Sequence, residues 1–252
     1  MDFSSIKDFL KEDLDKVNKL MATSLSTDIE LLDKTNRAIL SHNGKQVRPV
    51  LTLLVARACS GGFTTDDTIK YAAAVELLHN ATLLHDDVAD DSPVRRGVPT
   101  VMSILGGRAS VLLGDYWLVK GMENILASRN SSDKVIRIFA STLTDLAEGE
   151  LLQLQKAETG DTLEKDYYRI IYDKTASLFV ASAAAGAISV SATEEKMSAA
   201  RTYAKCLGVA FQIRDDIFDY EENVEIGKPV GLDLKEKKIT LPLLGALAKA
   251  GE

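Results

Sequence analysis

Apolar residues recur at helical spacing along nearly the whole chain. In the first such stripe, Ile6, Phe9, Leu10, Leu14 and Val17 follow steps of one, three and four residues, which places them on one face of a helix. No segment shows the period-two alternation of a half-buried strand, so the pattern predicts an all-α fold. Similar stripes cover approximately residues 25–41, 47–60, 66–91, 107–128, 133–157, 161–173, 174–190, 194–222 and 240–250.

Short Gly- and Pro-containing breaks separate these stripes, among them Gly61-Gly62, Gly106-Gly107 and Gly160-Asp161. No Pro- or Ser-rich linker divides the chain, so we expect residues 1–252 to form a single domain. The stripes at 66–91 and 194–222 are the longest, and at 1.5 Å per residue they would extend roughly 37 to 43 Å. They are therefore expected to be the central helices of a bundle.

The composition narrows the possible functions. Of 252 residues, 46% are hydrophobic and 27% charged, and 30 basic against 37 acidic side chains give a formal net charge of −7. An acidic pI near 5.1 argues against a nucleic-acid-binding surface. No stretch reaches the roughly 20 apolar residues of a membrane span, and the amino-terminal sequence does not resemble a secretory signal. These features, with two cysteines lacking CxxC spacing, predict a cytoplasmic protein with at most transient membrane contact.

One pattern occurs in both of the longest stripes. The segment LLHDDVAD at residues 83–90 is echoed by QIRDDIFD at residues 212–219, so each carries DDxxD inside apolar sequence. In a helix, carboxylates three and four residues apart lie on neighbouring turns of one side. The carboxylates concerned are Asp86, Asp87 and Asp90 in the first copy and Asp215, Asp216 and Asp219 in the second.

A solvated acidic face is the ordinary interpretation of a single DDxxD. Its apolar neighbours argue against that interpretation here, because a solvated face would be flanked by polar residues. Like charges at these spacings also destabilise a helix by about 0.2–0.5 kcal/mol per pair even in water. Carboxylate oxygens are hard ligands that suit Mg²⁺, which usually keeps several waters and shares substrate phosphates. Two such clusters therefore indicate a polyphosphate held through Mg²⁺.

Cationic residues near the predicted helix ends support a polyanionic ligand. Lys45 and Arg48 lie at the start of a helix, where the macrodipole disfavours positive charge unless an anion is bound. Each cation alone is more readily explained as surface charge. Together with paired metal sites, they indicate a diphosphate-binding cavity in an acidic protein. The others are Arg95, Arg96, Lys174, Lys228 and Lys238.

These motifs, in this order, resemble the signatures of the trans-isoprenyl diphosphate synthases, the polyprenyl synthetase family. The resemblance implies the isoprenoid-synthase fold, an antiparallel helix bundle around a central cavity, usually as a homodimer. It also implies prenyltransferase activity with isopentenyl diphosphate and an allylic prenyl diphosphate, and three Mg²⁺ ions. The segments that carry it are residues 44–49, 79–97, 174–175, 211–219, 227–229 and 238–242.

The resemblance also implies roles for individual residues. Asp86, Asp87 and Asp90 match the first metal-binding motif, and Asp215, Asp216 and Asp219 match the second. On its own, His79 would be read as a satisfied core histidine. Residues matching the isopentenyl diphosphate site are Lys45, Arg48, His79 and Arg96, and those matching groups on the allylic diphosphate are Arg95, Lys174, Thr175, Gln212, Lys228 and Lys238.

The growing prenyl chain is expected to lie in a tunnel along the helix that carries Asp86. Side chains on that face of the helix should therefore set the length of the product. Thr82 is one turn before Asp86, about 40° around the axis, and Ala81 borders the same face. In the family, aromatic residues at these two positions keep products short. Both residues are small here, so we expect a product of about C30 to C50, with Phe139 either the floor of the tunnel or an ordinary core residue.

Family members normally continue through further helices after the Thr240-Leu241-Pro242 segment, whereas this chain ends at Glu252, so the domain is expected to lack its carboxy-terminal helices.

The sequence leaves three alternatives to a chain-elongating synthase. A non-catalytic or regulatory subunit of a hetero-oligomeric synthase is one alternative, although it would not need both aspartate motifs. A metal phosphohydrolase built on His85-Asp86 and His42 is another, and a terpene cyclase with the same fold is a third.

Overall fold

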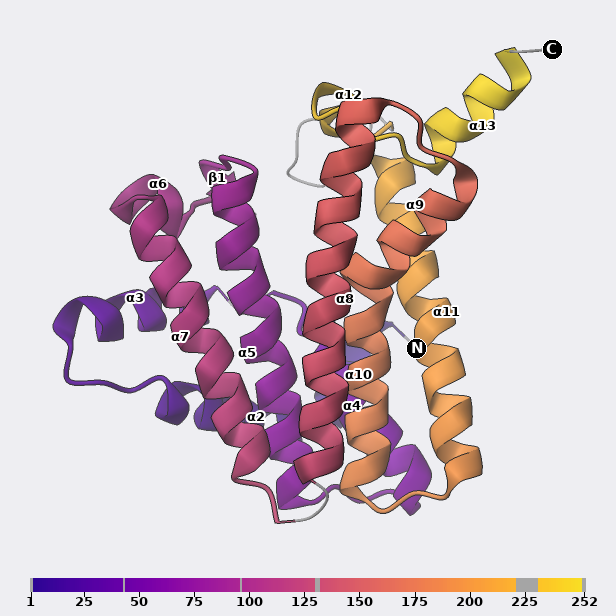
Figure 1. Cartoon of the computed structure of the whole chain (residues 1–252). Coiled ribbons are helices and arrows are strands. Elements are labelled where there is room, and N and C mark those ends of the chain that lie inside the picture. Colours follow the sequence, from indigo (N-terminus) through magenta and orange to yellow (C-terminus); the bar gives the residue numbers. More distant parts are fainter. Residues whose placement is uncertain (1, 43, 96, 130–131, 221–230, 251–252) are drawn as a thin grey trace. The chain divides into compact units, whose positions relative to one another are not determined.

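The computed structural model describes residues 2–42, 44–95, 97–129, 132–220 and 231–250, and helices dominate them (Figure 1). The elements up to the middle of the chain are α1 (Phe3–Phe9), α2 (Lys11–Ser24), α3 (Glu30–Ser41), α4 (Val47–Ser60), α5 (Asp66–Ala89), β1 (Val94–Arg95), β2 (Val98–Pro99), α6 (Val101–Leu105) and α7 (Gly107–Leu126). They are followed by α8 (Ser132–Thr159), α9 (Glu164–Ile171), the π-helix η1 (Tyr172–Ala176), α10 (Ser177–Ser189), α11 (Glu194–Phe218), α12 (Leu232–Lys235) and α13 (Leu241–Ala250). The all-α prediction is confirmed.

The chain forms two compact units. Unit 1 comprises Met1–Arg137 and Ala181–Ala200, and unit 2 comprises Ile138–Val180 and Arg201–Glu252. Helices α8, α10 and α11 each contribute residues to both units. The two predicted aspartate clusters belong to different units, the first to unit 1 and the second to unit 2.

In unit 1, the central helix is α5, which packs against α2, α4 and α7. Its middle section, from Tyr71 to Leu78, is buried and apolar except for Glu76, as expected of a helix with neighbours on every side. The core includes the fully buried Leu53, Leu77 and Trp117. In Figure 1, α5 and α7 run side by side. The packing of unit 1 therefore holds α5 in place, and with it the aspartates at its carboxyl end.

Buried polar contacts complete unit 1. The indole nitrogen of Trp117 donates to Asn36 Oδ1 at 2.8 Å, and Asn36 Nδ2 donates to the Leu25 carbonyl at 2.9 Å. A Cβ at Gly186 would collide with the Thr52 carbonyl, so the end of α10 approaches α4 at a distance that only glycine allows. These contacts fix α3 against α7 and α10 against α4.

In unit 2, α9, η1 and the start of α10 follow one another without an intervening loop. The sequence pattern placed a boundary between residues 173 and 174, but the chain instead widens there into five residues of π-helix, Tyr172–Ala176. The rings of Phe179 and Phe211 lie 5.7 Å apart and pack α10 against α11. Single turns of π-helix occur frequently at functional sites, and this one contains Lys174 and Thr175.

Other boundaries also differ from the stripes. The opening helix is divided at Leu10, where the backbone leaves helical geometry, into α1 and α2. The stripe at 66–91 ends as a helix at Ala89, and Asp91 adopts a positive φ of 47°. The antiparallel pair β1 and β2 was not predicted, because two residues per strand are too few to show an alternating pattern.

Gly208 permits the close approach of α11 to η1. A Cβ at this position would lie 2.6 Å from Ala176 Cα and 2.8 Å from Ala176 Cβ, both rigid groups. We predict that Gly208→Ala lowers the free energy of unfolding, because overpacking costs about 1–3 kcal/mol and exceeds the roughly 1 kcal/mol gained in helix propensity. Thermal denaturation measures this change.

The matched control is Gly245→Ala in α13, where an added Cβ meets nothing within 4 Å. Gly245→Ala is expected to leave the melting temperature unchanged or to raise it slightly. Equal melting temperatures for the two variants would show that the close contact between Gly208 and Ala176 does not constrain α11.

Candidate functional site

The first aspartate cluster lies at the carboxyl end of α5. Asp86 and Asp87 are in its last turn, and Asp90 is the residue that ends the helix. Asp87 is only 4% exposed, Asp86 is half-buried and Asp90 is exposed. Because the free carbonyl groups at this end of a helix carry partial negative charge, carboxylates here are disfavoured unless a cation lies close by.

Arg95 supplies one such cation to Asp87. The hairpin of β1 and β2 brings its Nε to 2.6 Å from Asp87 Oδ1. Burial raises the pKa of Asp87, and the hydrogen bond and charge of Arg95 oppose that rise. The family resemblance implied that Arg95 binds a diphosphate and that Asp87 binds a metal ion. In the structure, these two side chains contact each other. The neighbouring Arg96 lies outside the described residues.

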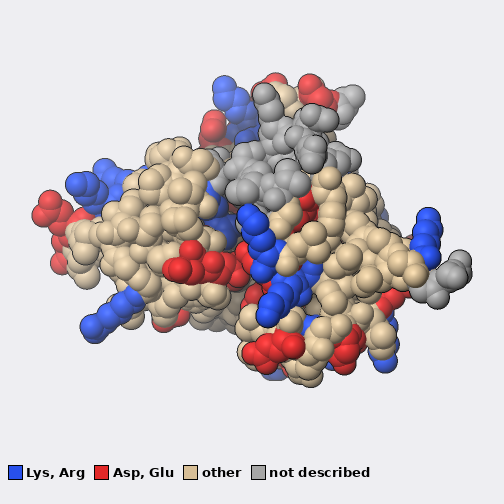
Figure 2. Space-filling model, turned by 90° about the horizontal axis from the view of Figure 1, so that it is seen from above, with Lys and Arg blue, Asp and Glu red and all other residues tan. Residues whose placement is uncertain are grey.

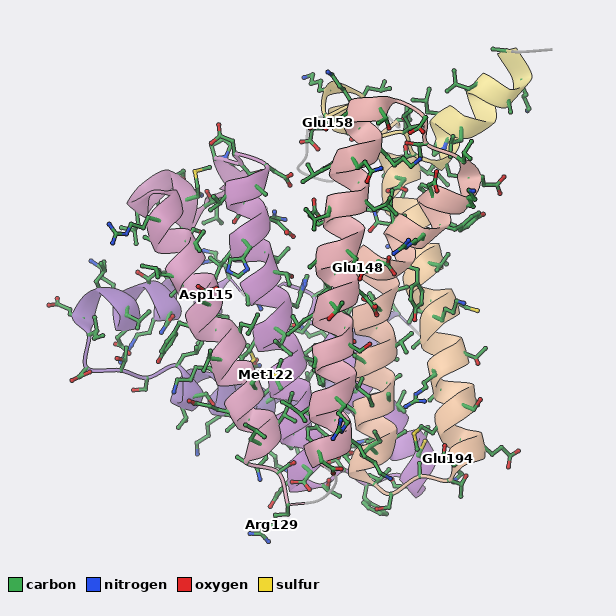
Figure 3. The ribbon with its side chains drawn as sticks, in the orientation of Figure 1. Asp115, Met122, Arg129, Glu148, Glu158 and Glu194 are labelled. Carbon is green, nitrogen blue, oxygen red and sulfur yellow. The ribbon has the colours of Figure 1, made fainter. Side chains whose placement is uncertain are left out.

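His85, beside the cluster, faces α7. Its Nε2 lies 3.2 Å from Asp115 Oδ1 and 3.3 Å from the Val111 carbonyl. The ring packs directly over Gly114, where a Cβ would overlap it. Figure 3 labels Asp115 on α7, next to α5. His85 therefore ties the last turn of α5 to α7.

The second cluster lies at the carboxyl end of α11 and repeats this placement. Asp215 and Asp216 are in the last turn, and Asp219 follows the final residue, Phe218. Asp216 is 6% exposed, while Asp215 and Asp219 are half-buried. Both clusters thus combine like charges, partial burial and the negative end of a helix dipole.

A network of neutral donors surrounds Asp216. Tyr167 Oη donates to Asp216 Oδ2 at 2.6 Å, and Gln212 Nε2 donates to Asp216 Oδ1 at 2.7 Å. Thr175 Oγ1 in turn donates to Gln212 Oε1 at 2.6 Å. Burial is the main cause that raises the pKa of Asp216. The negative charges of Asp215 and Asp219 raise this pKa further, whereas the hydrogen bonds from the two donors lower it.

The two clusters share a division of roles. In each, the second aspartate of the DD pair is buried and bound by donors of the protein. The first and last aspartates lie four residues apart and only about 40° around the helix, so they share one face. These outer carboxylates, Asp86 with Asp90 and Asp215 with Asp219, are the more accessible ones.

The oxygen donors suit Mg²⁺ better than softer metals. Among the described residues, no group of three or more His, Cys, Asp or Glu side chains is arranged so that it could hold a metal ion by itself. A Mg²⁺ ion at either cluster would therefore draw ligands from phosphate and water as well as from the protein, which is its usual behaviour.

The described residues assigned to isopentenyl diphosphate lie on, or just before, two helices of unit 1. Arg48 is in the first turn of α4, Lys45 precedes that helix and is exposed, and His79 is half-buried on α5. Helices α4 and α5 pack together. Gln46 holds a left-handed conformation with φ of 55°, and its amide donates to Asn18 Oδ1 at 2.7 Å, which fixes the entry into α4.

Of the cations assigned to the allylic diphosphate, Arg95 lies in unit 1, and Lys174 and Lys238 lie in unit 2. Lys174 Nζ donates to Gln153 Oε1 at 3.0 Å and forms an ion pair with Glu150 of α8. Lys238 Nζ pairs with Glu236. On the same helix α8, Glu148, labelled in Figure 3, pairs with Arg169 at 3.0 Å. Lys228 lies outside the described residues.

Sequence reasoning missed Gly149, which lets α8 approach η1. A Cβ there would lie 2.7 Å from Asp173 Cβ and 3.0 Å from Lys174 Cγ. Glycine inside a long amphipathic stripe is a weak signal, since it is also tolerated without a packing reason. The glycine sets the distance between Lys174 and its partners on α8.

Asp233 was also missed. Its backbone N–H donates to Asp219 Oδ2 at 3.1 Å, and the Gly231 N–H donates to the Asp219 carbonyl at 2.9 Å. Burial, with the charges of Asp219 and Asp216, raises the pKa of Asp233 to about 7. A carboxylate 14 positions away from Asp219 carries no helical spacing signal, so the sequence pattern did not connect it to the cluster.

The residues assigned to product length differ in burial. Ala81 is fully buried in the core of unit 1, and Thr82 is half-buried with its hydroxyl donating to the His79 carbonyl at 2.8 Å. Phe139 is fully buried in unit 2. A larger side chain at Ala81 would overpack that core, whereas Thr82 is only partly buried.

Charge on the surface is mixed. The face shown from above in Figure 2 carries acidic and basic side chains among uncharged ones. Among the described residues, no helix is both long and apolar enough to cross a membrane.

Comparisons with known proteins identify the family to which the chain belongs. The sequence profile of the Polyprenyl synthetase family matches residues 29–252. The octaprenyl diphosphate synthase of Escherichia coli (strain K12) is 38% identical over 248 residues, which are 98% of this chain and 76% of that protein. The heptaprenyl diphosphate synthase component 2 of Bacillus subtilis (strain 168) is 36% identical over 251 residues, 98% of this chain and 70% of that protein.

Solved structures extend the similarity to the fold. A decaprenyl diphosphate synthase from Rhodobacter capsulatus superimposes with a TM-score of 0.91 at 37% identity, over 98% of this chain and 76% of that one. A polyprenyl synthase from Caulobacter crescentus CB15, complexed with calcium and isoprenyl diphosphate, gives 0.91 at 38% identity, over 99% and 75%. These similarities confirm the isoprenoid-synthase fold. The chain belongs to the polyprenyl synthetase family, the trans-isoprenyl diphosphate synthases, whose members are prenyltransferases.

Proposed function

We propose that this chain catalyses the Mg²⁺-dependent head-to-tail condensation of isopentenyl diphosphate with an allylic prenyl diphosphate, giving a trans-polyprenyl diphosphate and diphosphate. The observation that carries the proposal is the repeated carboxylate cluster at the ends of α5 and α11. Each cluster places three negative charges where the helix dipole already disfavours them, and bound divalent cations would relieve that conflict.

The outer carboxylates, Asp86, Asp90, Asp215 and Asp219, are proposed as the ligands, with three Mg²⁺ ions on one allylic diphosphate as the family resemblance implies. When bound, Mg²⁺ would act as a Lewis acid on the leaving diphosphate. The relative crystallised with calcium and isoprenyl diphosphate supports a divalent cation in this fold.

The residues of the chain would bind and orient the two diphosphates. Lys174 and Thr175 on η1, with Gln212 on α11, are proposed for the allylic diphosphate, together with Arg95, Lys228 and Lys238. Positive charge placed at the leaving group stabilises the charge that develops as the allylic C–O bond breaks. Lys45, Arg48, His79 and Arg96 are proposed to hold isopentenyl diphosphate so that its double bond meets the allylic cation. The proton lost afterwards needs no side-chain base if the departed diphosphate accepts it.

The alternatives receive less support. His85 contacts Asp115 and Val111, and the His42 ring contacts the Ala38 carbonyl, so both histidines have structural partners outside a phosphohydrolase site. A relative named as component 2 of a heptaprenyl diphosphate synthase keeps a hetero-oligomeric assembly as the second candidate. We propose a homodimeric, cytoplasmic enzyme in which residues 1–252 form one prenyltransferase domain.

Prenyl transfer by the purified protein tests the proposal. With Mg²⁺, isopentenyl diphosphate and farnesyl diphosphate, we expect Asp86→Asn and Asp215→Asn each to lower kcat/KM at least about 100-fold, since metal stabilisation of the leaving group supplies several kcal/mol. Excess EDTA should abolish turnover. The control is Asp28→Asn, which alters an exposed aspartate of unit 1.

Turnover that persists in EDTA, or in both cluster variants, would contradict the metal-dependent mechanism. Activity that appears only after a second, different subunit is added would instead favour the hetero-oligomeric alternative.

We further propose that the product is longer than farnesyl diphosphate, about C30 to C50, because the buried Ala81 and the half-buried Thr82, one turn before Asp86, both have small side chains. The relatives named as octaprenyl and heptaprenyl diphosphate synthases support this range. Phe139 is proposed as the floor of the tunnel.

Thr82→Phe tests the tunnel, because this half-buried position accepts a ring more easily than the fully buried Ala81. We expect products to shorten to near C15 to C20, the aromatic ring lying one helical turn beyond Asp86. Thr82→Val, which stays small, should leave the product length unchanged. Products are sized by chromatography after dephosphorylation, and an unchanged length in Thr82→Phe would refute the assignment.

A further inference from the structure

Tyr167, on α9, is a buried residue that none of the expected roles includes. Its side chain is 3% exposed, and its ring meets Tyr168 edge-on with centroids 5.5 Å apart. The phenol oxygen lies 2.6 Å from Asp216 Oδ2. Burial and the adjacent carboxylate raise the pKa of Tyr167 well above its ordinary value, so the phenol stays a hydrogen-bond donor.

Among the described residues, this contact is one of two hydrogen bonds that hold the Asp216 carboxylate. Oδ2 accepts from Tyr167, and Oδ1 accepts from Gln212 at 2.7 Å. The amide of Gln212 is fixed in turn, because its Oε1 accepts from Thr175 at 2.6 Å. The carboxylate therefore has a single orientation, defined by groups from α9, η1 and α11.

The π-helix helps to bring two of these groups to α11. Tyr167 and Thr175 are eight residues apart, so in a continuous α-helix they would be offset by roughly 80° around the axis. The wider i to i+5 turns of η1 rotate the chain through less angle per residue and so reduce that offset. Both hydroxyl groups can then address the same face of α11.

The two buried aspartates differ in the charge of their partners. Asp87 is bound by the cation Arg95, which cancels one negative charge of the first cluster. Asp216 instead accepts hydrogen bonds from the neutral side chains of Tyr167 and Gln212, which stabilise the carboxylate without reducing the negative charge of the second cluster. That charge is what a divalent cation requires.

We propose that Tyr167 is a positioning residue for the second carboxylate cluster: its hydroxyl fixes Asp216, and with it the last turn of α11, so that Asp215 and Asp219 present their carboxylates to Mg²⁺ and diphosphate. The inference rests on the proposed function and adds a residue that acts through Asp216.

The first test is Tyr167→Phe, which keeps the ring and removes only the hydroxyl. Calorimetric titration of Mg²⁺ into the full chain with saturating inorganic diphosphate should show an affinity about tenfold weaker than wild type, as expected for loss of a hydrogen bond to a charged group. In turnover assays, half-saturating Mg²⁺ should rise by a similar factor while KM for isopentenyl diphosphate stays unchanged. Tyr168→Phe, the same substitution at a side chain that is 40% exposed, should match wild type in both measurements.

A double-mutant cycle separates positioning through Asp216 from a general effect on folding. Replacing both partners of a buried hydrogen bond by apolar groups of similar shape is far less destabilising than removing one. In the Asp216→Leu background, Tyr167→Phe should change Mg²⁺ affinity by less than about twofold, because the acceptor is already absent. If Tyr167→Phe alone does not fold, a loss of Mg²⁺ affinity larger than about twofold on adding Tyr167→Phe to Asp216→Leu would still contradict the inference.

Wild-type Mg²⁺ affinity in Tyr167→Phe, or equal losses in the wild-type and Asp216→Leu backgrounds, would overturn the inference and leave the proposed function standing. Failure of the wild-type chain both to bind Mg²⁺ with diphosphate and to transfer prenyl groups would instead refute the proposed function.

Discussion

Hydrogen bonds to Asp87 and Asp216 hold one carboxylate of each cluster at the negative end of a long helix. Burial, neighbouring carboxylates and the helix dipole all oppose a negative charge at these positions. Each buried aspartate is retained because donors from other segments compensate it, a guanidinium for Asp87 and neutral groups for Asp216. Once the buried carboxylate is fixed, the outer two of each cluster share one face of the helix. The proposed metal chemistry depends on that arrangement.

Close backbone approach builds the surroundings of the second cluster. Gly208 lets α11 approach Ala176, and Gly149 lets α8 approach Asp173 and Lys174, so η1 is packed tightly on two sides. The π-helical turns in the same segment place Thr175 within reach of Gln212. A rigid packing of this kind is what a site needs if small displacements of its ligands weaken binding.

The sequence predicted the helices well, because a helix produces a short-range periodic spacing, and the same kind of spacing identified the two aspartate clusters as candidates. The 66–91 stripe corresponds to α5, and each DDxxD falls at a helix end. The rest of the site depends on contacts without such spacing. Tyr167 and Asp216 are 49 positions apart, and the pairing of Arg95 with Asp87 requires a hairpin of two-residue strands. A periodicity of 3.6 also cannot distinguish η1 from a junction between two helices, since one wide turn only shifts the phase of the pattern.

We propose that both carboxylate clusters bind the metal ions of one diphosphate. The most direct measurement is anomalous diffraction from crystals grown with Mn²⁺ in place of Mg²⁺ and with an unreactive thiolo analogue of farnesyl diphosphate. We expect Mn²⁺ ions whose ligands include Asp86 or Asp90 and Asp215 or Asp219, together with oxygens of the same diphosphate. Bound analogue with Mn²⁺ at one cluster alone, or with no Mn²⁺ at either, would contradict it.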